Sequence, residues 1–136
     1  MSSYLTKSNE NIECAKFLYK SKRYYPSIIH SSYYSAFQLV KHILLNELLR
    51  DENSLNDEQK NKNIGRHELY NNLIVKNLNE SDADLALEIN NDLTKLKKYR
   101  IDSDYRTTEF RALEYGLIIK LAENILNKLQ IKFNIK

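Results

Sequence analysis

A chain of 136 residues is the size of one ordinary domain, and we predict a single domain over residues 1–136. Hydrophobic side chains make up 42% of it and charged ones 29%, which excludes a disordered chain and a membrane protein. Two glycines and one proline are too few for the tight turns of a sandwich or barrel, so the composition favours an all-α protein. The lone Cys14 cannot form an internal disulfide and the N-terminus lacks the apolar stretch of a signal peptide, so we expect a cytoplasmic protein.

The apolar spacing in the first half predicts three helices. Apolar residues recur every three or four positions over 8–20, behind a possible cap at Ser8, and again over 26–50. Pro26 fits the first turn of that second helix. Residues 51–63 are almost wholly polar and predict a mobile loop. A shorter helix should follow Gly65 and end near residue 78.

Two further helices are predicted in the second half. One begins at Ser81, which with Asp84 approximates a capping box, and runs to about residue 104. Thr107 or Thr108 would cap the last helix. Its predicted apolar stripe consists of Phe110, Leu113, Leu117, Leu121, Ile125 and Leu129. Long amphipathic helices with short connections favour antiparallel neighbours, so we predict an antiparallel four-helix bundle with the shorter third helix packed at one end.

Basic residues are concentrated toward the C-terminus, where residues 95–136 hold 10 of the 21 basic side chains and 5 of the 18 acidic ones. Such a concentration suits phosphate binding, although many basic runs are solvated helix faces. The sequence contains no glycine-rich phosphate loop, zinc-type Cys/His spacing, nucleophile elbow or paired-histidine motif. We therefore expect neither a metal nor a cofactor.

The strongest signal for a binding site lies around Arg100, which continues the apolar stripe of the fourth helix. A guanidinium cannot lose its proton, so it must reach water, pair with a carboxylate or bind an anionic ligand. Asp104, four residues on, is a candidate partner, and the alternative interpretation is an ordinary Arg100–Asp104 helix pair. Tyr105 adds an aromatic face and Arg106 a second cation, which suit the base and phosphate of a nucleotide.

Two other positions are candidates for the same chemistry. Arg66 and His67 open the third helix, where a helix N-terminus can hold an anion, although helix starts often carry polar residues on the solvent side. Tyr34 lies on a different side of the second helix from Tyr33 and Phe37, which we assign to the core, and is a candidate groove residue.

The segment Ala15–Leu45, with Arg23–Phe37 at its centre, resembles the opening helical pair of HEPN domains, which carry a similar Tyr-Tyr-x-x-Phe core. Arg66-His67 after a polar loop and Arg100-x-x-x-Asp104-Tyr105 near the end of the fourth helix fall where small stand-alone HEPN proteins carry comparable elements. The resemblance covers most of the chain and implies a helical bundle that commonly dimerises. Arg23 and His30 match the spacing of a HEPN ribonuclease motif, but Pro26 prevents one continuous helix from spanning both, so we assign no function to the pair.

Many HEPN proteins are metal-independent endoribonucleases of toxin–antitoxin, phage-defence or CRISPR systems and use an arginine followed by a histidine. This resemblance implies RNA or a nucleotide as ligand and makes Arg100 the motif arginine. Some HEPN toxins extend the motif to Arg-x4-Tyr-x-His, whereas this chain reads Arg100-x4-Tyr105-x-Thr107. Thr107 therefore stands where an imidazole would move protons near neutral pH, a task that a hydroxyl does not perform.

Two arrangements would supply an imidazole: His67 could reach Arg100 from the third helix, or the second subunit of a homodimer could provide one. Without either, the protein would be a binding module. HEPN proteins are often encoded beside a nucleotidyltransferase that modifies the motif tyrosine. The resemblance thus makes Tyr105 a modification candidate and such an enzyme a candidate partner.

We therefore hypothesise a dimeric HEPN-type protein of a toxin–antitoxin or antiviral defence system that binds RNA or nucleotides. If it cleaves RNA, Arg100 and His67 are the candidate catalytic residues. The candidate ligand contacts are Tyr34, Arg66, Arg100, Asp104, Tyr105 and Arg106. The alternative is a non-catalytic helical module that binds a protein partner, for example a nucleotidyltransferase, through its helix faces.

Overall fold

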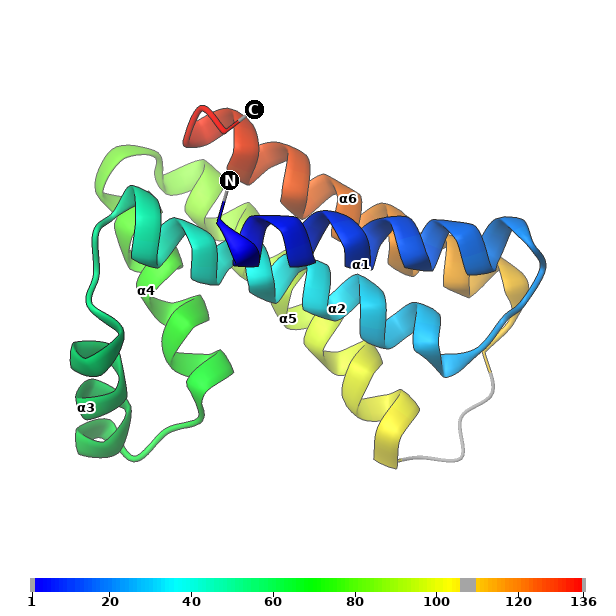
Figure 1. Cartoon of the computed structure of the whole chain (residues 1–136), viewed down its shortest axis with the longest axis horizontal. Coiled ribbons are helices and arrows are strands. Elements are labelled where there is room, and N and C mark those ends of the chain that lie inside the picture. The colour runs from blue at the N-terminus through cyan, green and yellow to red at the C-terminus, as the bar shows by residue number, and fades with distance from the viewer. Residues whose placement is uncertain (1, 106–109, 136) are drawn as a thin grey trace.

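The computed structural model describes residues 2–105 and 110–135, and in this part of the chain all regular structure is helical (Figure 1). This confirms the all-α prediction. The elements in chain order are α1 (Ser3–Lys20), α2 (Pro26–His42), the π-helical turn η1 (Ile43–Glu47), α3 (Glu52–Lys62), α4 (Arg66–Ser81), α5 (Ala83–Tyr105) and α6 (Ala112–Lys132). None of these helices has the length and apolar character of a membrane span.

Helix α2 is the centre of the bundle because it packs against α1, α4, α5 and α6. It lies antiparallel beside α1, while α6 runs along both and α5 crosses at an angle (Figure 1). Its central position explains why Ile28, Ile29, Leu39 and Val40 are fully buried. Proline at the first helical position starts α2, as the sequence predicts.

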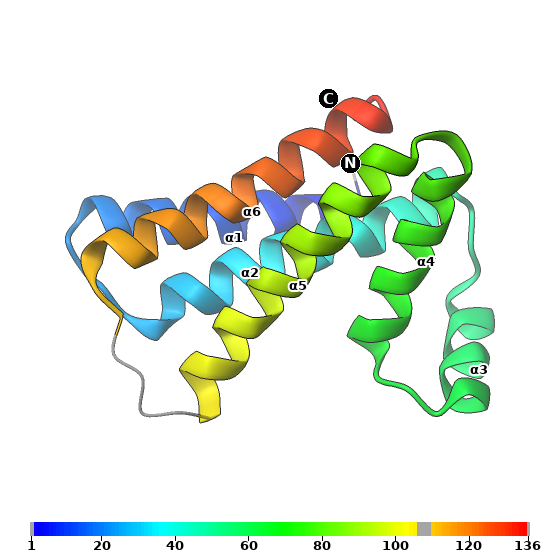
Figure 2. The ribbon, with the colours of Figure 1, turned by 180° about the vertical axis from the view of Figure 1, so that it is seen from behind.

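Helices α4 and α5 meet at Asp82 and diverge from there (Figure 2). The two helices are therefore the arms of a V, and the start of α4 and the end of α5 lie at its open end (Figure 2). Helix α2 contacts both α4 and α5. Side chains from three helices can therefore meet between the arms.

The prediction of a loop over residues 51–63 is wrong, because most of this polar segment forms helix α3. The Asp51 carboxylate accepts a hydrogen bond from the Ser54 backbone N–H at 3.0 Å and caps the helix. Asn63 ends it in a left-handed conformation with φ of 51°. Leu55 is the buried residue that anchors α3, so a sustained apolar stripe is not needed.

Several predicted helix ends also differ from the structure. The first helix begins five residues earlier than predicted, at Ser3, and the predicted cap Ser8 is buried inside it, where its hydroxyl donates to the Ser35 carbonyl at 2.7 Å. The second helix ends in η1 instead of continuing to residue 50. Asp82, not Ser81, caps α5, because its carboxylate accepts from the Leu85 N–H at 3.1 Å.

The buried face of α6 matches the predicted stripe only in part, since Ile125 and Leu129 are fully buried as predicted. Leu113 and Leu117, assigned to the core, are 67% and 52% exposed. The core takes the neighbouring face, which includes Tyr115, Ile118 and Ala122. Both faces of this helix carry apolar residues, so spacing alone does not choose between them. The predicted caps Thr107 and Thr108 lie outside the described residues.

Candidate functional site

The candidate site is built around Tyr33, a buried residue in the middle of α2. The guanidinium carbon of Arg100, from α5, lies 4.6 Å from the centre of the Tyr33 ring. The Tyr33 hydroxyl forms a hydrogen bond with Nδ1 of His67, from the first turn of α4. The two residues that the sequence identified as candidates for catalysis thus contact the same tyrosine from different helices.

Aromatic side chains of α2 hold the His67 ring in place. His67 stacks on Phe37, with ring centres 3.9 Å apart and planes 8° apart. Tyr34 meets the same imidazole edge-on at 6.0 Å. Tyr34 is half-buried, whereas Phe37 is buried as the sequence predicts. The position of the imidazole is therefore fixed by packing as well as by its hydrogen bond.

Burial lowers the pKa of His67 to about 4, and the positive charges of Arg100, Lys97 and Arg66 act in the same direction. Its imidazole is consequently neutral near pH 7. Burial raises the pKa of Tyr33 to about 12, although Arg100 opposes that change. Tyr33 therefore keeps its proton, and the pair consists of a neutral hydroxyl and a neutral imidazole with a lone pair.

Arg100 forms no ion pair with a carboxylate among the described residues, and its buried Nε has no hydrogen-bond partner. The Arg100–Asp104 helix pair that the sequence allowed is not formed. Instead, Oδ1 of Asp104 lies 2.6 Å from Nε2 of His30 on α2. The guanidinium rests on an aromatic face, which attracts a cation but offers the buried Nε–H no acceptor in the plane of the guanidinium.

The start of α4 adds a second cationic feature to this site. Gly65 occupies the N-cap position and has no side chain to accept from the first backbone N–H groups of α4. The positive end of the helix dipole lies at the same terminus, beside His67 and the exposed Arg66. Arg66, Lys97 and Arg100 all place positive charge near His67, so the site favours an anion.

The remaining predicted contacts are less closely grouped. Tyr105, the last residue of α5, is 79% exposed. Arg106 and Thr107 lie outside the described residues.

Sequence reasoning gave no function to His30. The signal that could have found it is its spacing to Tyr33 and Phe37, because steps of three and four residues place all three on one face of α2.

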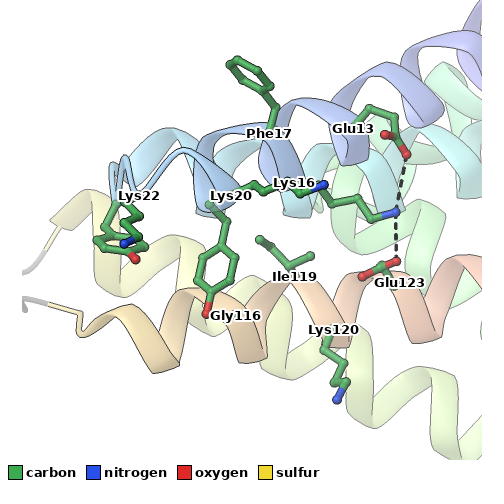
Figure 3. A pocket seen from close by; sticks show the side chains of 11 residues that line it. Glu13, Lys16, Phe17, Lys20, Lys22, Gly116, Ile119, Lys120 and Glu123 are labelled. Atoms are coloured by element: carbon green, nitrogen blue, oxygen red, sulfur yellow. Dashed lines mark hydrogen bonds and ion pairs between the residues drawn. The ribbon is translucent and has the colours of Figure 1, made fainter.

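Within the described ranges, no group of three or more His, Cys, Asp or Glu side chains is arranged to hold a metal ion. A pocket of about 810 Å³ lies elsewhere, between α1 and α6 (Figure 3). The Lys16 ammonium sits between the carboxylates of Glu13 and Glu123, at 3.5 and 3.2 Å. Because Gly116 has no side chain, the Tyr19 ring packs directly against the backbone of α6 at this position. None of the residues around Tyr33 lines this pocket.

The structure is a helical bundle with a cationic site where α2, α4 and α5 meet. The family model of the HEPN domain matches residues 1–132, so the chain belongs to the HEPN family. Comparisons with curated proteins and with solved structures found no match. Family membership confirms the resemblance stated above and supports a nucleotide- or RNA-related function. HEPN domains often dimerise and bind RNA.

Proposed function

We propose that this HEPN protein binds RNA by holding a backbone phosphate between Arg100 and the start of α4. The observation that carries the proposal is the Arg100 guanidinium, which has a buried Nε without a partner and no carboxylate in ion-pair contact among the described residues. A phosphate offers the planar guanidinium the paired acceptors that it lacks.

The surroundings of Arg100 suit the rest of a nucleotide. The uncapped N–H groups of α4 and the Arg66 side chain supply further phosphate donors. Tyr105 offers an exposed aromatic face on which a base can stack. Asp104 and Tyr34 border the site from α5 and α2 respectively.

In this proposal His67 also serves cleavage, as the proton acceptor of a metal-independent endoribonuclease. A neutral imidazole takes the proton from the ribose 2′-hydroxyl while Arg100 stabilises the charge that develops on the phosphorus oxygens. The Nδ1–Tyr33 hydrogen bond leaves Nε2 to accept that proton in the tautomer in which Nδ1 donates to the Tyr33 oxygen.

RNA binding is tested with a fluorescently labelled single-stranded RNA and Arg100→Gln. We expect at least about a tenfold loss of affinity, as for a charge-assisted hydrogen bond removed from a partly buried site. Lys120→Gln is the matched control, because it removes the same charge from the pocket between α1 and α6. Wild-type affinity should also fall log-linearly with salt concentration. Equal losses in the two variants, or no RNA binding by the wild type, would reject the proposal.

A second function is favoured by the exposure of Leu113 and Leu117, since adjacent apolar side chains on a helix surface suit a protein partner. In that case the chain is a non-catalytic interaction module, and Arg100→Gln leaves partner binding unchanged. We propose that either function serves a toxin–antitoxin or antiviral defence system in the cytoplasm, as the HEPN resemblance implies. It also makes the exposed Tyr105 the proposed target of a partner nucleotidyltransferase. Mass spectrometry of Tyr105→Phe and wild type after co-expression with such an enzyme tests this.

A further inference from the structure

His30 and Asp104 form a pair that the proposed function does not use. They come from α2 and α5, and Nε2 of His30 lies 2.6 Å from Oδ1 of Asp104. At this distance Nε2 carries the hydrogen and donates it to the carboxylate. The His30 side chain is nevertheless 40% exposed, and its second nitrogen, Nδ1, takes no part in the contact with Asp104.

The pair belongs to the same contact between α2 and α5 as Arg100. His30 lies one turn before Tyr33 on α2, and Asp104 lies one turn after Arg100 on α5. The His30–Asp104 contact and the Tyr33–Arg100 contact therefore lie one helical turn apart along two helices that pack together. His30 is placed about 5 Å along α2 from the tyrosine under the guanidinium.

His67 contacts the other end of the same tyrosine, since its Nδ1 forms a hydrogen bond with the Tyr33 hydroxyl. It stacks on Phe37, one turn after Tyr33 on α2, whereas His30 is one turn before Tyr33. Along α2, one imidazole is therefore placed before and one after the tyrosine that supports Arg100. Displacement at a phosphate needs a proton removed from the attacking oxygen on one side and a proton delivered to the leaving oxygen on the other.

We propose that His30, oriented by Asp104, is the proton donor for RNA cleavage at the Arg100 site and replaces the imidazole missing at position 107. The inference rests on the proposed function, because it requires a phosphate at Arg100. The 2′-oxygen forms a bond to phosphorus and its proton passes to His67. The bond from phosphorus to the 5′-oxygen breaks, and protonated His30 gives that oxygen its proton. The products are a 2′,3′-cyclic phosphate and a 5′-hydroxyl.

The Asp104 carboxylate positions the imidazole in this arrangement. Its hydrogen bond to Nε2 fixes the ring orientation and leaves Nδ1 as the atom that faces the ligand. Asp104 is therefore a positioning residue, and His30 is the group that touches the leaving oxygen.

The test compares two RNA substrates that differ in the leaving atom. One is ordinary RNA and the other carries sulfur in place of the bridging 5′-oxygen, so that a thiolate leaves without needing a proton. His30→Gln should slow cleavage of ordinary RNA by about 100-fold or more, the usual contribution of a general acid. The same variant should cleave the sulfur-bridged substrate within about tenfold of the wild type, because its proton donor is no longer required.

Matched variants separate this role from a structural one. Arg100→Gln should remain slow on both substrates, since phosphate binding and charge stabilisation are lost in each. His42→Gln removes an imidazole outside the site, one that contacts Ser2 and Glu47, and should leave both rates unchanged. Asp104→Asn should slow cleavage of ordinary RNA less than His30→Gln does. Its cleavage of the sulfur-bridged substrate should also stay close to the wild-type rate.

Three results would overturn the inference. Equal slowing of His30→Gln on both substrates would show that the pair only fastens α5 to α2, and wild-type rates in this variant would show that it has no role. A wild type that binds RNA through Arg100 but cleaves neither substrate would also overturn the inference while RNA binding stands. A wild type that binds no RNA would reject the proposed function itself and the role of His30 with it.

Discussion

At the scale of single residues, Tyr33 links the two candidate catalytic groups. Its ring supports the Arg100 guanidinium and its hydroxyl satisfies one nitrogen of His67. A buried hydroxyl needs a hydrogen-bond partner, so the burial of Tyr33 and the position of His67 depend on each other. Arg100 in turn acts on His67 through its charge.

This electrostatic coupling predicts the effect of Arg100→Gln on the titration of His67. The pKa of His67 should rise above about 4, because a positive charge that disfavours the imidazolium is removed. It should stay below the ordinary value of 6.5, since burial is the larger cause and remains. A proton NMR titration of the imidazole measures this shift, with Lys120→Gln as the control of equal charge. An unchanged His67 pKa in Arg100→Gln would contradict the coupling.

The lowered pKa of His67 also predicts how stability depends on pH. Because the folded pKa of about 4 lies below the unfolded value near 6.5, the unfolded chain binds the proton more tightly. The contribution of His67 is fully present above pH 6.5 and declines as the pH falls toward 4. Between pH 7.5 and pH 5 the wild type should lose about 2 kcal/mol from this group.

His67→Gln isolates that contribution, because glutamine does not titrate. Urea unfolding at the two pH values should show a smaller loss of stability in His67→Gln than in the wild type, by about the same 2 kcal/mol. Identical losses in the two proteins would mean that His67 titrates normally in the folded state.

At the scale of elements, helix α3 depends on Leu55 and on its caps. Leu55 is fully buried, while most of the other side chains of α3 are exposed. Leu55→Ala should cost about 3 kcal/mol of local stability, as expected for a buried leucine. The measurement is amide hydrogen exchange, which should accelerate over residues 52–62 and remain slow in α2 and α6. Leu87→Ala, at an exposed leucine of α5, is the control, and protection of α3 that survives Leu55→Ala would contradict this anchor.

The helices differ in how far their sequences specify local structure. The helices α1, α2, α4 and α5 could be predicted because their apolar spacing is regular and their buried faces follow it. Helix α3 could not, because Asp51 and Asn63 as caps and one anchoring leucine leave no periodic pattern. In α6 the apolar residues on two faces left the buried face undetermined until α1, α2 and α5 were placed against it.

At the scale of the whole molecule, the site could be predicted only in part, since it depends on how three helices meet. The sequence was enough to select Arg100 as a cation in a helix, and His67 and Tyr34 as ring side chains on two other helices. Their convergence on Tyr33 depends on the angle at which α4 and α5 diverge, which no local pattern encodes (Figure 2). His30 was given no function because Pro26 separates it from Arg23, and its actual partner, Asp104, lies 74 positions away on another helix.

The exposed leucines of α6 lead to the last prediction, which concerns assembly. Leu113 and Leu117 lie one turn apart on the face of α6 that the core does not use, and HEPN domains often dimerise. We therefore expect a homodimer in which this face of α6 contacts a second copy, because water-exposed leucines at successive turns gain most from mutual burial. The double variant Leu113→Lys/Leu117→Lys should shift sedimentation from dimer to monomer. Leu49→Lys/Leu87→Lys, at exposed leucines outside α6, should leave the dimer intact. A monomeric wild type, or a dimer that persists in Leu113→Lys/Leu117→Lys, would show that this face of α6 is not a homodimer interface.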